Sequence, residues 1–194
     1  MNYLAHIYLS GEDDQLKIGN FIADAVKGKN FIDFPDRIQK GIILHRAIDT
    51  YTDSHEIVKK SVSRLFPVYS HYSTVIVDIL YDHFLAANWE KFSSTPLPQY
   101  VSDFYQLLEK NLGELPVTVR EFYPYMVRDN WLLNYATIEG IGKILSQMNQ
   151  RTKNRSKMNL AVKELEIFYK EFQEEFLVFF EDLEKFTQTY INRI

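Results

Sequence analysis

The chain has no cysteine among its 194 residues. This absence excludes disulfide frameworks, zinc–thiolate sites, iron–sulfur clusters and thiol nucleophiles. Any metal ion would have to be held by nitrogen and oxygen atoms, which in practice means histidine and carboxylate side chains.

Glycine and proline are also scarce. The chain has 7 glycines and 6 prolines, where average composition would give about 14 and about 10. So few helix breakers disfavour the many tight turns of an all-β sandwich and favour long helices. With 46% hydrophobic residues, a chain of this length can bury roughly 70% of its unfolded surface. We therefore expect an ordered, all-α protein.

Two kinds of segment are missing as well. The N-terminus lacks the basic and apolar stretches of a signal peptide, and no apolar run approaches the length of a membrane span. The net charge of −4 argues against nucleic-acid binding through a broad basic surface. These absences favour a cytoplasmic protein with neither a membrane nor a nucleic acid as its partner.

Hydrophobic spacing divides the chain into helices. Apolar positions three and four apart predict helices at residues 38–51, from 54 to just before Pro67, 68–89, 99–112, 125–134 and 138–149. Residues 151–157 form a basic connector, and apolar positions from 160 to 186 predict one long amphipathic C-terminal helix. No run alternates with the period of a strand. The pattern predicts a single-domain helical bundle over residues 1–194.

Polar residues on one helical face mark the first candidate site. His45 and Asp49 are four residues apart in the helix predicted at 38–51, so both project from the same face, about 6 Å apart. An imidazole nitrogen and a carboxylate oxygen at that separation can share a metal ion. Asp53 lies one turn further and would serve as a third ligand or orient a neighbouring histidine. The alternative is a surface His–Asp pair with Asp53 capping a helix.

Asp82 and His83 form a second unusual pair, in the middle of the helix predicted at residues 68–89. A buried, unpaired carboxylate is strongly destabilising, so Asp82 should meet a metal ion or another cation. Asp78 lies one turn earlier on the same face and adds negative charge there. A salt bridge from Asp82 to Arg46 or Arg128 is the alternative to a metal.

Two further polar residues interrupt apolar stretches: His6 and Asp24. Each alone is typical of a satisfied core residue, but several separated helices offering histidine or aspartate are what a metal site in a helical bundle requires. The chain has no Glu-x-x-His pair, which disfavours a ferritin-like di-iron centre. It also lacks the zinc-protease His-Glu-x-x-His motif, the Gly-x-Ser-x-Gly elbow and a phosphate-binding Walker loop.

At these residues the sequence resembles a known family, the acyl carrier protein phosphodiesterases (holo-acyl-carrier-protein hydrolases). The resemblance rests on residues 2–6 (NYLAH), 19–24 (GNFIAD) with Gly28, 41–49 (GIILHRAID) with 52–53 (TD), 82–85 (DHFL) with Trp89, and 131–132 (WL) with Tyr135. These motifs occur in order, from residue 1 to about residue 150.

The resemblance implies a helical fold akin to the HD-domain phosphohydrolases and a divalent metal ion, Mn²⁺ before Mg²⁺ or Fe²⁺. It implies hydrolysis of the phosphodiester that joins 4′-phosphopantetheine to a serine of holo-acyl carrier protein. The residues at matching motifs, and hence the candidate metal ligands, are His6, Asp24, His45, Asp49, Asp82 and His83. The HD superfamily is named for a His-Asp doublet, whereas Asp82-His83 has the reverse order, so ligand roles are carried over by position only.

Such a reaction needs positive charge and an activated water. Asp24 or Asp53 would accept a proton from that water, and a histidine that binds no metal would protonate the serine alkoxide. Arg46, next to His45, would neutralise a phosphate oxygen. An ion pair of Arg46 with Asp49 or Asp53 is the alternative.

Acyl carrier proteins are small and acidic, so the resemblance also implies a basic docking surface. The one dense basic run is Arg151, Lys153, Arg155 and Lys157, and a solvated connector is its alternative role. Two other functions fit the same residues. One is an HD-type phosphohydrolase of another phosphate ester, such as a nucleotide, and the other is a helical interaction module without enzymatic activity.

Overall fold

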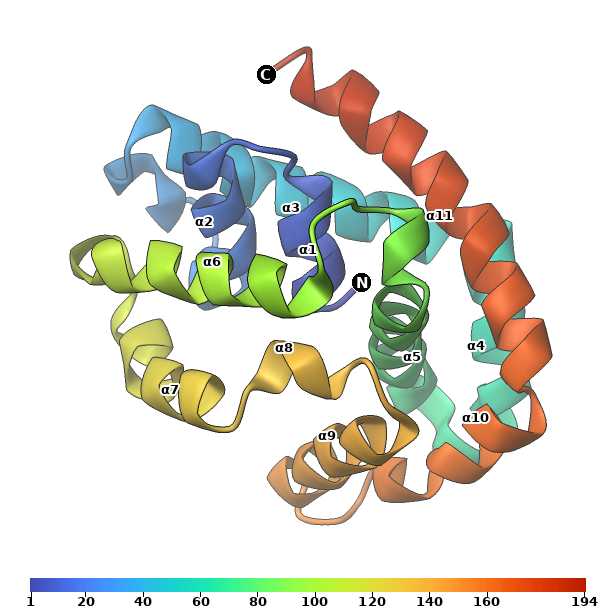
Figure 1. The fold of residues 1–194 in the computed structure, drawn as a ribbon. Helices are drawn as coiled ribbons and strands as arrows, with labels where there is room; N and C mark the ends of the chain where they lie inside the picture. Colours follow the sequence, from blue (N-terminus) through green and yellow to red (C-terminus); the bar gives the residue numbers. More distant parts are fainter.

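A computed structural model describes every residue from 1 to 194. Its regular structure is entirely helical, which confirms the all-α fold class (Figure 1). The α-helices are α1 (Tyr3–Leu9), α2 (Asp14–Ile22), α3 (Asp36–Ser54), α4 (Glu56–Tyr69), α5 (Ser73–Ala87), α6 (Leu97–Lys110), α7 (Val117–Arg128), α8 (Trp131–Asn134), α9 (Ile138–Arg151), α10 (Val162–Ile167) and α11 (Tyr169–Ile191). One hydrophobic cluster of 48 buried residues runs through them, from Met1 to Leu183.

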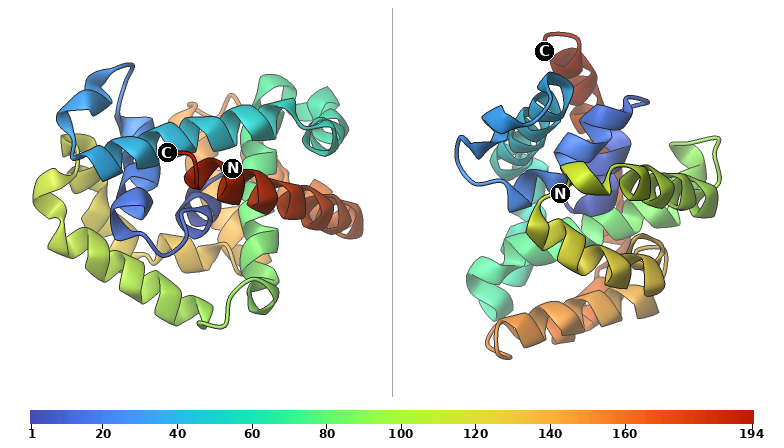
Figure 2. Two further views of the ribbon diagram at one scale, coloured as in Figure 1. Left: turned by 90° about the horizontal axis from the view of Figure 1, so that it is seen from above. Right: turned by 90° about the vertical axis from the view of Figure 1, so that its left-hand side faces the viewer.

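Helix α5 lies in the middle of the molecule. Its residues are apolar almost all round, and most of them are buried, as expected of a helix with neighbours on every side. Helices α1, α4, α9 and α11 all contact it, and the two views in Figure 2 show it crossing the centre of the fold. The short helix α1 therefore packs against α5 on one side and α2 on the other.

Two glycines allow α2 and α3 to pack unusually closely. A Cβ added at Gly19 would lie 2.1 Å from the carbonyl oxygen of Ile38, and one at Gly41 would lie 2.5 Å from that of Leu16. Any side chain at either position would push the helices apart. The close approach brings the backbone of Asn20, which follows Gly19, against the middle of α3.

Several helix boundaries differ from the predicted ones. Helix α4 continues through Pro67 to Tyr69, because a proline in the last turn removes only one hydrogen bond of a helix that is about to end. Helix α7 begins at Val117, after Pro116, and not near residue 125. It is separated from α8 by Asn130, whose left-handed backbone (φ 48°) interrupts the helix predicted at 125–134.

The long C-terminal helix predicted from residue 160 is divided into α10 and α11 at Phe168. Phe168 leaves the helical conformation there, and α11 runs on to Ile191 with Phe172, Phe176, Phe179 and Phe180 buried. Figure 1 shows α11 along one edge of the molecule, beside α4 and α5. No helix combines the length and the apolar composition needed to cross a bilayer.

A buried ion pair joins α4 to α11. The carboxylate of Glu175 accepts two hydrogen bonds from the guanidinium of Arg64, at 2.8 and 2.7 Å, and one from the hydroxyl of Ser61. Only 7% of the Glu175 side chain and 16% of that of Arg64 are exposed. Burial alone would raise the pKa of Glu175, but its bonds to Arg64, Ser61 and Lys60 outweigh that effect and lower it. The charged form is therefore favoured in the folded protein.

We expect Glu175→Gln to lower the free energy of unfolding by about 3 kcal/mol at pH 7, because Arg64 loses its buried partner. Since the folded pKa lies below the unfolded value, the ion pair stabilises the protein above that unfolded value and ceases to do so as the pH falls. The difference between variant and wild type should thus shrink below about pH 4. Urea unfolding of variant and wild type at pH 7 and below about pH 4 measures this difference in stability. The matched control is Glu174→Gln, at an exposed position. Equal stability of Glu175→Gln and wild type at pH 7 would contradict the prediction.

Candidate functional site

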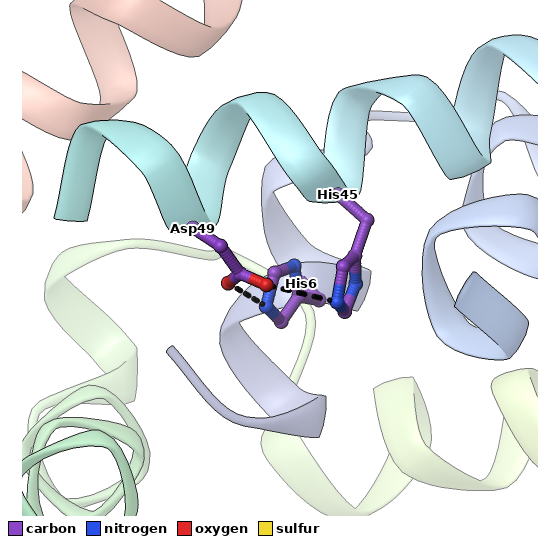
Figure 3. A group of neighbouring side chains, drawn as sticks. All are labelled: His6, His45 and Asp49. Atoms are coloured by element: carbon purple, nitrogen blue, oxygen red, sulfur yellow. Dashed lines mark ion pairs between the residues drawn. The ribbon is translucent and has the colours of Figure 1, made fainter. Parts of the chain in front are cut away.

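Three side chains from α1 and α3 converge close to the α-amino group of Met1 (Figure 3). The carboxylate of Asp49 contacts both imidazoles. His6 Nε2 lies 3.2 Å from its Oδ1, and His45 Nε2 lies 3.1 Å from its Oδ2. The two rings stack, with centroids 3.9 Å apart. The nitrogen and carboxylate atoms that could hold a metal ion all lie within 4.8 Å of one another.

The spacing of residues in the sequence explains why His45 and Asp49 lie together, but not why His6 joins them. His45 and Asp49 are one helical turn apart on α3, so they share a face as predicted. His6 comes from α1, which lies between α2 and α5. His6 and His45 are 2% and 6% exposed, so both rings are removed from water.

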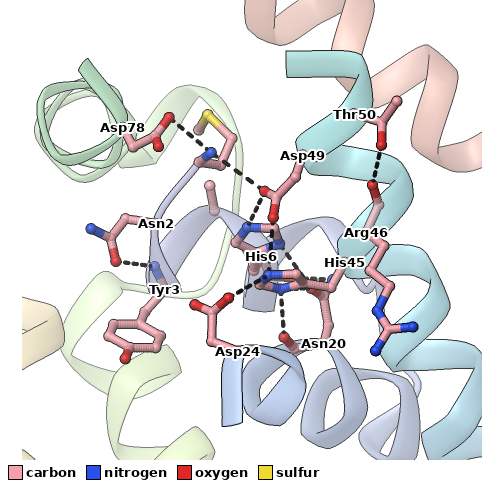
Figure 4. A network of polar contacts seen from close by, with 12 residues as sticks. Asn2, Tyr3, His6, Asn20, Asp24, His45, Arg46, Asp49, Thr50 and Asp78 are labelled. Carbon is pink, nitrogen blue, oxygen red and sulfur yellow. Dashed lines mark hydrogen bonds and ion pairs between the residues drawn. The ribbon is translucent and has the colours of Figure 1, made fainter. Parts of the chain in front are cut away.

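Asn20, on α2, holds both imidazoles in one orientation (Figure 4). Its side-chain Nδ2 donates to the carbonyl of His6 and to the hydroxyl of Ser10, which leaves Oδ1 facing the rings. Oδ1 lies 2.8 Å from His6 Nδ1, and the Asn20 carbonyl oxygen lies 2.9 Å from His45 Nδ1. Because both contacts are acceptors, each Nδ1 must carry the proton. The Nε2 atoms are then left to face Asp49.

Burial and charge give the two histidines opposite pKa shifts. Burial, together with the nearby charge of His45, lowers the pKa of His6 to about 4. Burial also disfavours the charged form of His45, but hydrogen bonds to Asp24 and Asp49 outweigh it and raise its pKa to about 9. The hydrogen bond from His45 and the nearby α-amino charge of Met1 hold the pKa of Asp49 well below its usual range, despite burial. One histidine of the stacked pair is thus charged and the other neutral.

Asp24 completes the group from the turn that follows α2. Its Oδ1 lies 3.2 Å from His45 Nε2, and this hydrogen bond lowers the pKa of Asp24. Asp24, His45, Asp49 and Asp53 all line one cavity of about 380 Å³. Asp53 lies one turn beyond Asp49 at the exposed end of α3. Asp24 and Asp49 both contact His45, and the side chain of Asp24 is the more exposed of the two, at 73% against 41%.

Arg46 lies away from this cavity. Its guanidinium donates to the carbonyls of Val26 and Gly28 and covers the ring of Phe31. Figure 4 shows the side chain directed away from His6, His45 and Asp49. Arg46 does not form the ion pair with Asp49 or Asp53 that was its alternative role, and it anchors the loop that follows Asp24.

Asp82 is buried but binds backbone, not a side-chain cation. Its carboxylate accepts hydrogen bonds from the N–H groups of Asn2 and Leu4 at 3.1 and 2.7 Å, and from Ala5 at 3.4 Å. Asp78, one turn earlier, accepts from the buried α-amino group of Met1 at 3.0 Å. Asp78 is thus paired with a cation at the start of α1, whereas Asp82 meets backbone N–H groups in place of the cation expected for it, and neither pairs with an arginine.

We expect Asp82→Ala to lower the free energy of unfolding by about 3 kcal/mol, because it leaves buried N–H groups without an acceptor. Asp82→Asn, which keeps one acceptor oxygen, should lose less. Thermal unfolding measures both, with Asp103→Ala on the exposed face of α6 as a control. Unchanged stability together with lost metal binding would instead make Asp82 a metal ligand.

His83 lies on a different face of α5 from Asp82, as neighbouring helical residues must. Its Nδ1 is 2.7 Å from the carbonyl oxygen of Tyr135 and its Nε2 is 3.2 Å from the hydroxyl of Tyr169. Both ring nitrogens are therefore engaged with neighbours outside the group around Asp49. The structure brings together His6, Asp24, His45 and Asp49, and it does not bring Asp82 or His83 to them.

Sequence reasoning missed Asn20 and the far wall of the cavity. An amide among the apolar residues of 16–22 was the available signal for Asn20. The far wall is formed by α8 and α9, and its residues are Trp131, Asn134, Tyr135, Lys143, Ile144, Gln147, Met148 and Arg151. Only the folded structure places Arg151, at the end of α9, across from Asp24 and Asp49.

Among known proteins, the chain is similar to one family. Residues 1–183 match the family model of acyl carrier protein phosphodiesterase. A curated relative of that name from Photorhabdus laumondii subsp. laumondii is 30% identical over 181 residues, covering 93% of this chain and 91% of the relative. Its namesake from Pectobacterium atrosepticum is 29% identical over 190 residues, covering 97% and 98%. The relative of the same name from Yersinia pestis is 29% identical over 181 residues, covering 93% of this chain and 94% of the relative. No solved structure matches the chain significantly.

Proposed function

Because the chain belongs to the acyl carrier protein phosphodiesterase family, we propose that it hydrolyses the diester between 4′-phosphopantetheine and the serine of holo-acyl carrier protein. We further propose that this hydrolysis requires a divalent metal ion, with Mn²⁺ as the first choice. The ion would be held by His6, His45 and Asp49, with Asp24 beside it.

One observation carries the metal proposal. His6 Nε2 is buried and makes no hydrogen bond, although Asp49 Oδ1 is only 3.2 Å away. With its proton on Nδ1 and its pKa lowered to about 4, His6 turns a lone pair toward a carboxylate oxygen. Two electron-rich atoms face each other favourably only when a cation lies between them. Two imidazole nitrogens and a carboxylate are also ligands that suit Mn²⁺, Fe²⁺ or Zn²⁺.

The bound ion would supply a Lewis acid for the phosphate and lower the pKa of a water molecule. Asp24 is the carboxylate best placed to accept a proton from the attacking water, because it borders the cavity and touches His45. Its lowered pKa keeps it ionised and ready to accept. Asn20 contributes by holding both rings in the required tautomer.

The cavity suits a substrate with a phosphate at one end of a slender arm. Apolar side chains of Val75, Trp131, Ile144 and Met148 line it next to the charged group. They would cover the aliphatic part of the pantetheine arm and reduce access of water around the reacting phosphate. His45 is the one histidine that lines the cavity. His83 does not border it, so the proton for the serine alkoxide would have to come from another group.

Dialysis against a chelator is expected to abolish hydrolysis, and Mn²⁺ to restore it. Mass spectrometry of holo-acyl carrier protein then measures the loss of one phosphopantetheine group per molecule, and elemental analysis measures metal per chain. A metal-loaded protein that leaves the carrier protein intact but cleaves a nucleotide would favour the other phosphohydrolase function. Full activity in chelator, with no metal bound, would contradict the metal proposal.

A further inference from the structure

The cavity has an acidic wall and a basic wall. The acidic wall comes from α3, α5 and the turn after α2, and its residues are Asp24, Asp49, Asp53 and Asp78. On the opposite side, Lys143, Gln147 and Arg151 are four residues apart and form one face of α9. A phosphodiester is an anion, so the aspartates alone would repel it. The lysine and the arginine of α9 are the cations available to attract it.

Arg151 is the α9 cation without a carboxylate partner. Lys143 forms an ion pair with Glu139, one turn away on the same helix, at 2.7 Å. The guanidinium of Arg151 makes one weak contact, with the sulfur of Met148 at 3.7 Å. It is exposed at the cavity and close enough for its charge to act on the phenol of Tyr3. Its hydrogen-bond donors are free to bind a phosphate.

The basic loop, residues 152–157, follows Arg151 and has a fixed conformation. Lys153, Asn154 and Lys157 have left-handed backbones, with φ of 55°, 60° and 57°, although non-glycine residues avoid that region. The hydroxyl of buried Ser156 donates to Asn149 Oδ1 at 3.0 Å, and Asn149 Nδ2 donates to Asn154 Oδ1 at 2.9 Å.

These bonds hold an otherwise unfavourable backbone in place. Lys153, Arg155 and Lys157 remain exposed and form no ion pair within the chain. A flexible, solvated connector would need neither the buried serine nor the asparagine bonds. The loop therefore presents three cations in a defined arrangement, directly after Arg151, which lines the cavity.

We propose that the end of α9 and the basic loop together recognise the substrate. Arg151 binds the phosphate of the diester inside the cavity, and Lys153, Arg155 and Lys157 bind an acidic surface of the protein that carries it. This inference rests on the proposed function, since it assigns both halves of one substrate to adjacent parts of the chain. The charges of the loop and of an acidic carrier protein are complementary.

Two variants separate the two roles. In the loop variant, Lys153, Arg155 and Lys157 are all replaced by serine, and in the other variant Arg151 becomes glutamine. The charge control replaces Lys59, Lys170 and Lys185, on α4 and α11, by serine. Binding of holo-acyl carrier protein is measured with metal-free protein, so that no turnover occurs. Hydrolysis is measured with holo-acyl carrier protein and with bis(4-nitrophenyl) phosphate, a small diester that has no protein part.

The loop variant is expected to bind carrier protein about tenfold more weakly than the charge control at low salt, with a smaller dependence on salt. Its hydrolysis of the small diester should match wild type. Arg151→Gln should lower kcat/KM for both substrates at least tenfold. Single Arg155→Ser, at a residue without the left-handed backbone, repeats the binding test if the triple variant does not fold.

Equal binding by the loop variant and the charge control would overturn the docking role, and unchanged small-diester kinetics in Arg151→Gln would overturn the phosphate role. Failure of the proposed function has a different signature. Metal-loaded wild type would then hydrolyse no holo-acyl carrier protein at all, whatever the binding results.

Discussion

His45→Gln is expected to lower kcat/KM for holo-acyl carrier protein by about 10³-fold or more, because the proposed metal ion loses a central ligand. His45 touches every other member of the site. Its Nε2 lies 3.2 Å from Asp24 and 3.1 Å from Asp49, and its Nδ1 is bound to the carbonyl of Asn20. Glutamine has a similar reach but cannot place a nitrogen lone pair between the two carboxylates.

The fold should survive this change. His45 lies at the edge of the cavity, and its two carboxylate partners are partly exposed, so water can replace the imidazole. Circular dichroism and metal content are measured beside activity, with His55→Gln as the control, because His55 lies outside the cavity beside Asp182. A folded His45→Gln protein that keeps more than a tenth of its activity would remove His45 from the ligand set.

Asn20→Ala is expected to weaken Mn²⁺ binding about 10- to 100-fold, although Asn20 would not touch the ion. Its side-chain oxygen keeps the proton of His6 on Nδ1, and without that acceptor the imidazole can place the proton on Nε2, where the metal should bind. Calorimetric titration with Mn²⁺ measures the affinity. Nitrogen NMR of the metal-free protein reports which ring nitrogen carries the proton.

Two further variants distinguish orientation from general damage. Asn20→Asp keeps an oxygen beside both rings and should restore most of the affinity. Ser10→Ala removes the hydroxyl that accepts from Asn20 Nδ2, but leaves both histidine contacts intact, so its effect should be small. Wild-type NMR signals and wild-type metal affinity in Asn20→Ala would show that the rings are oriented by packing alone.

Hydrophobic spacing predicted α3 well, but it assigned no helix to residues 1–37, where α1 and α2 carry His6 and Asn20. The reasons for its other failures are local. Helix α3 was placed within three residues at either end, because its apolar face is continuous from residue 38 to residue 51. Helix α7 was placed too late, since Pro124 inside it looks like a boundary. The break at Phe168 follows from tertiary packing and has no proline or glycine to mark it.

The site was predictable where chemistry and spacing coincide on one helix, as for His45 and Asp49. It was not predictable where two segments meet. Asp82 and His6 look alike in the sequence, as polar residues within apolar stretches, yet one accepts backbone N–H groups and the other faces a carboxylate. Whether such a residue accepts backbone N–H groups or faces a carboxylate depends on how α1 packs against α5. No local sequence pattern encodes this packing.

The bonds from α1 to Asp82 also bear on the order in which the site forms. Helix α1 has 7 residues, too few to be stable alone in water. Its first N–H groups are satisfied by a carboxylate nearly eighty positions later in the sequence, so α1 becomes ordered only after α5 is in place. We therefore expect His6 to be the last of the proposed ligands to reach the site. A metal ion that binds His6 would stabilise α1 in its packed position and suppress its local opening. Metal binding should therefore slow the exchange of the backbone amide hydrogens at the N-terminus.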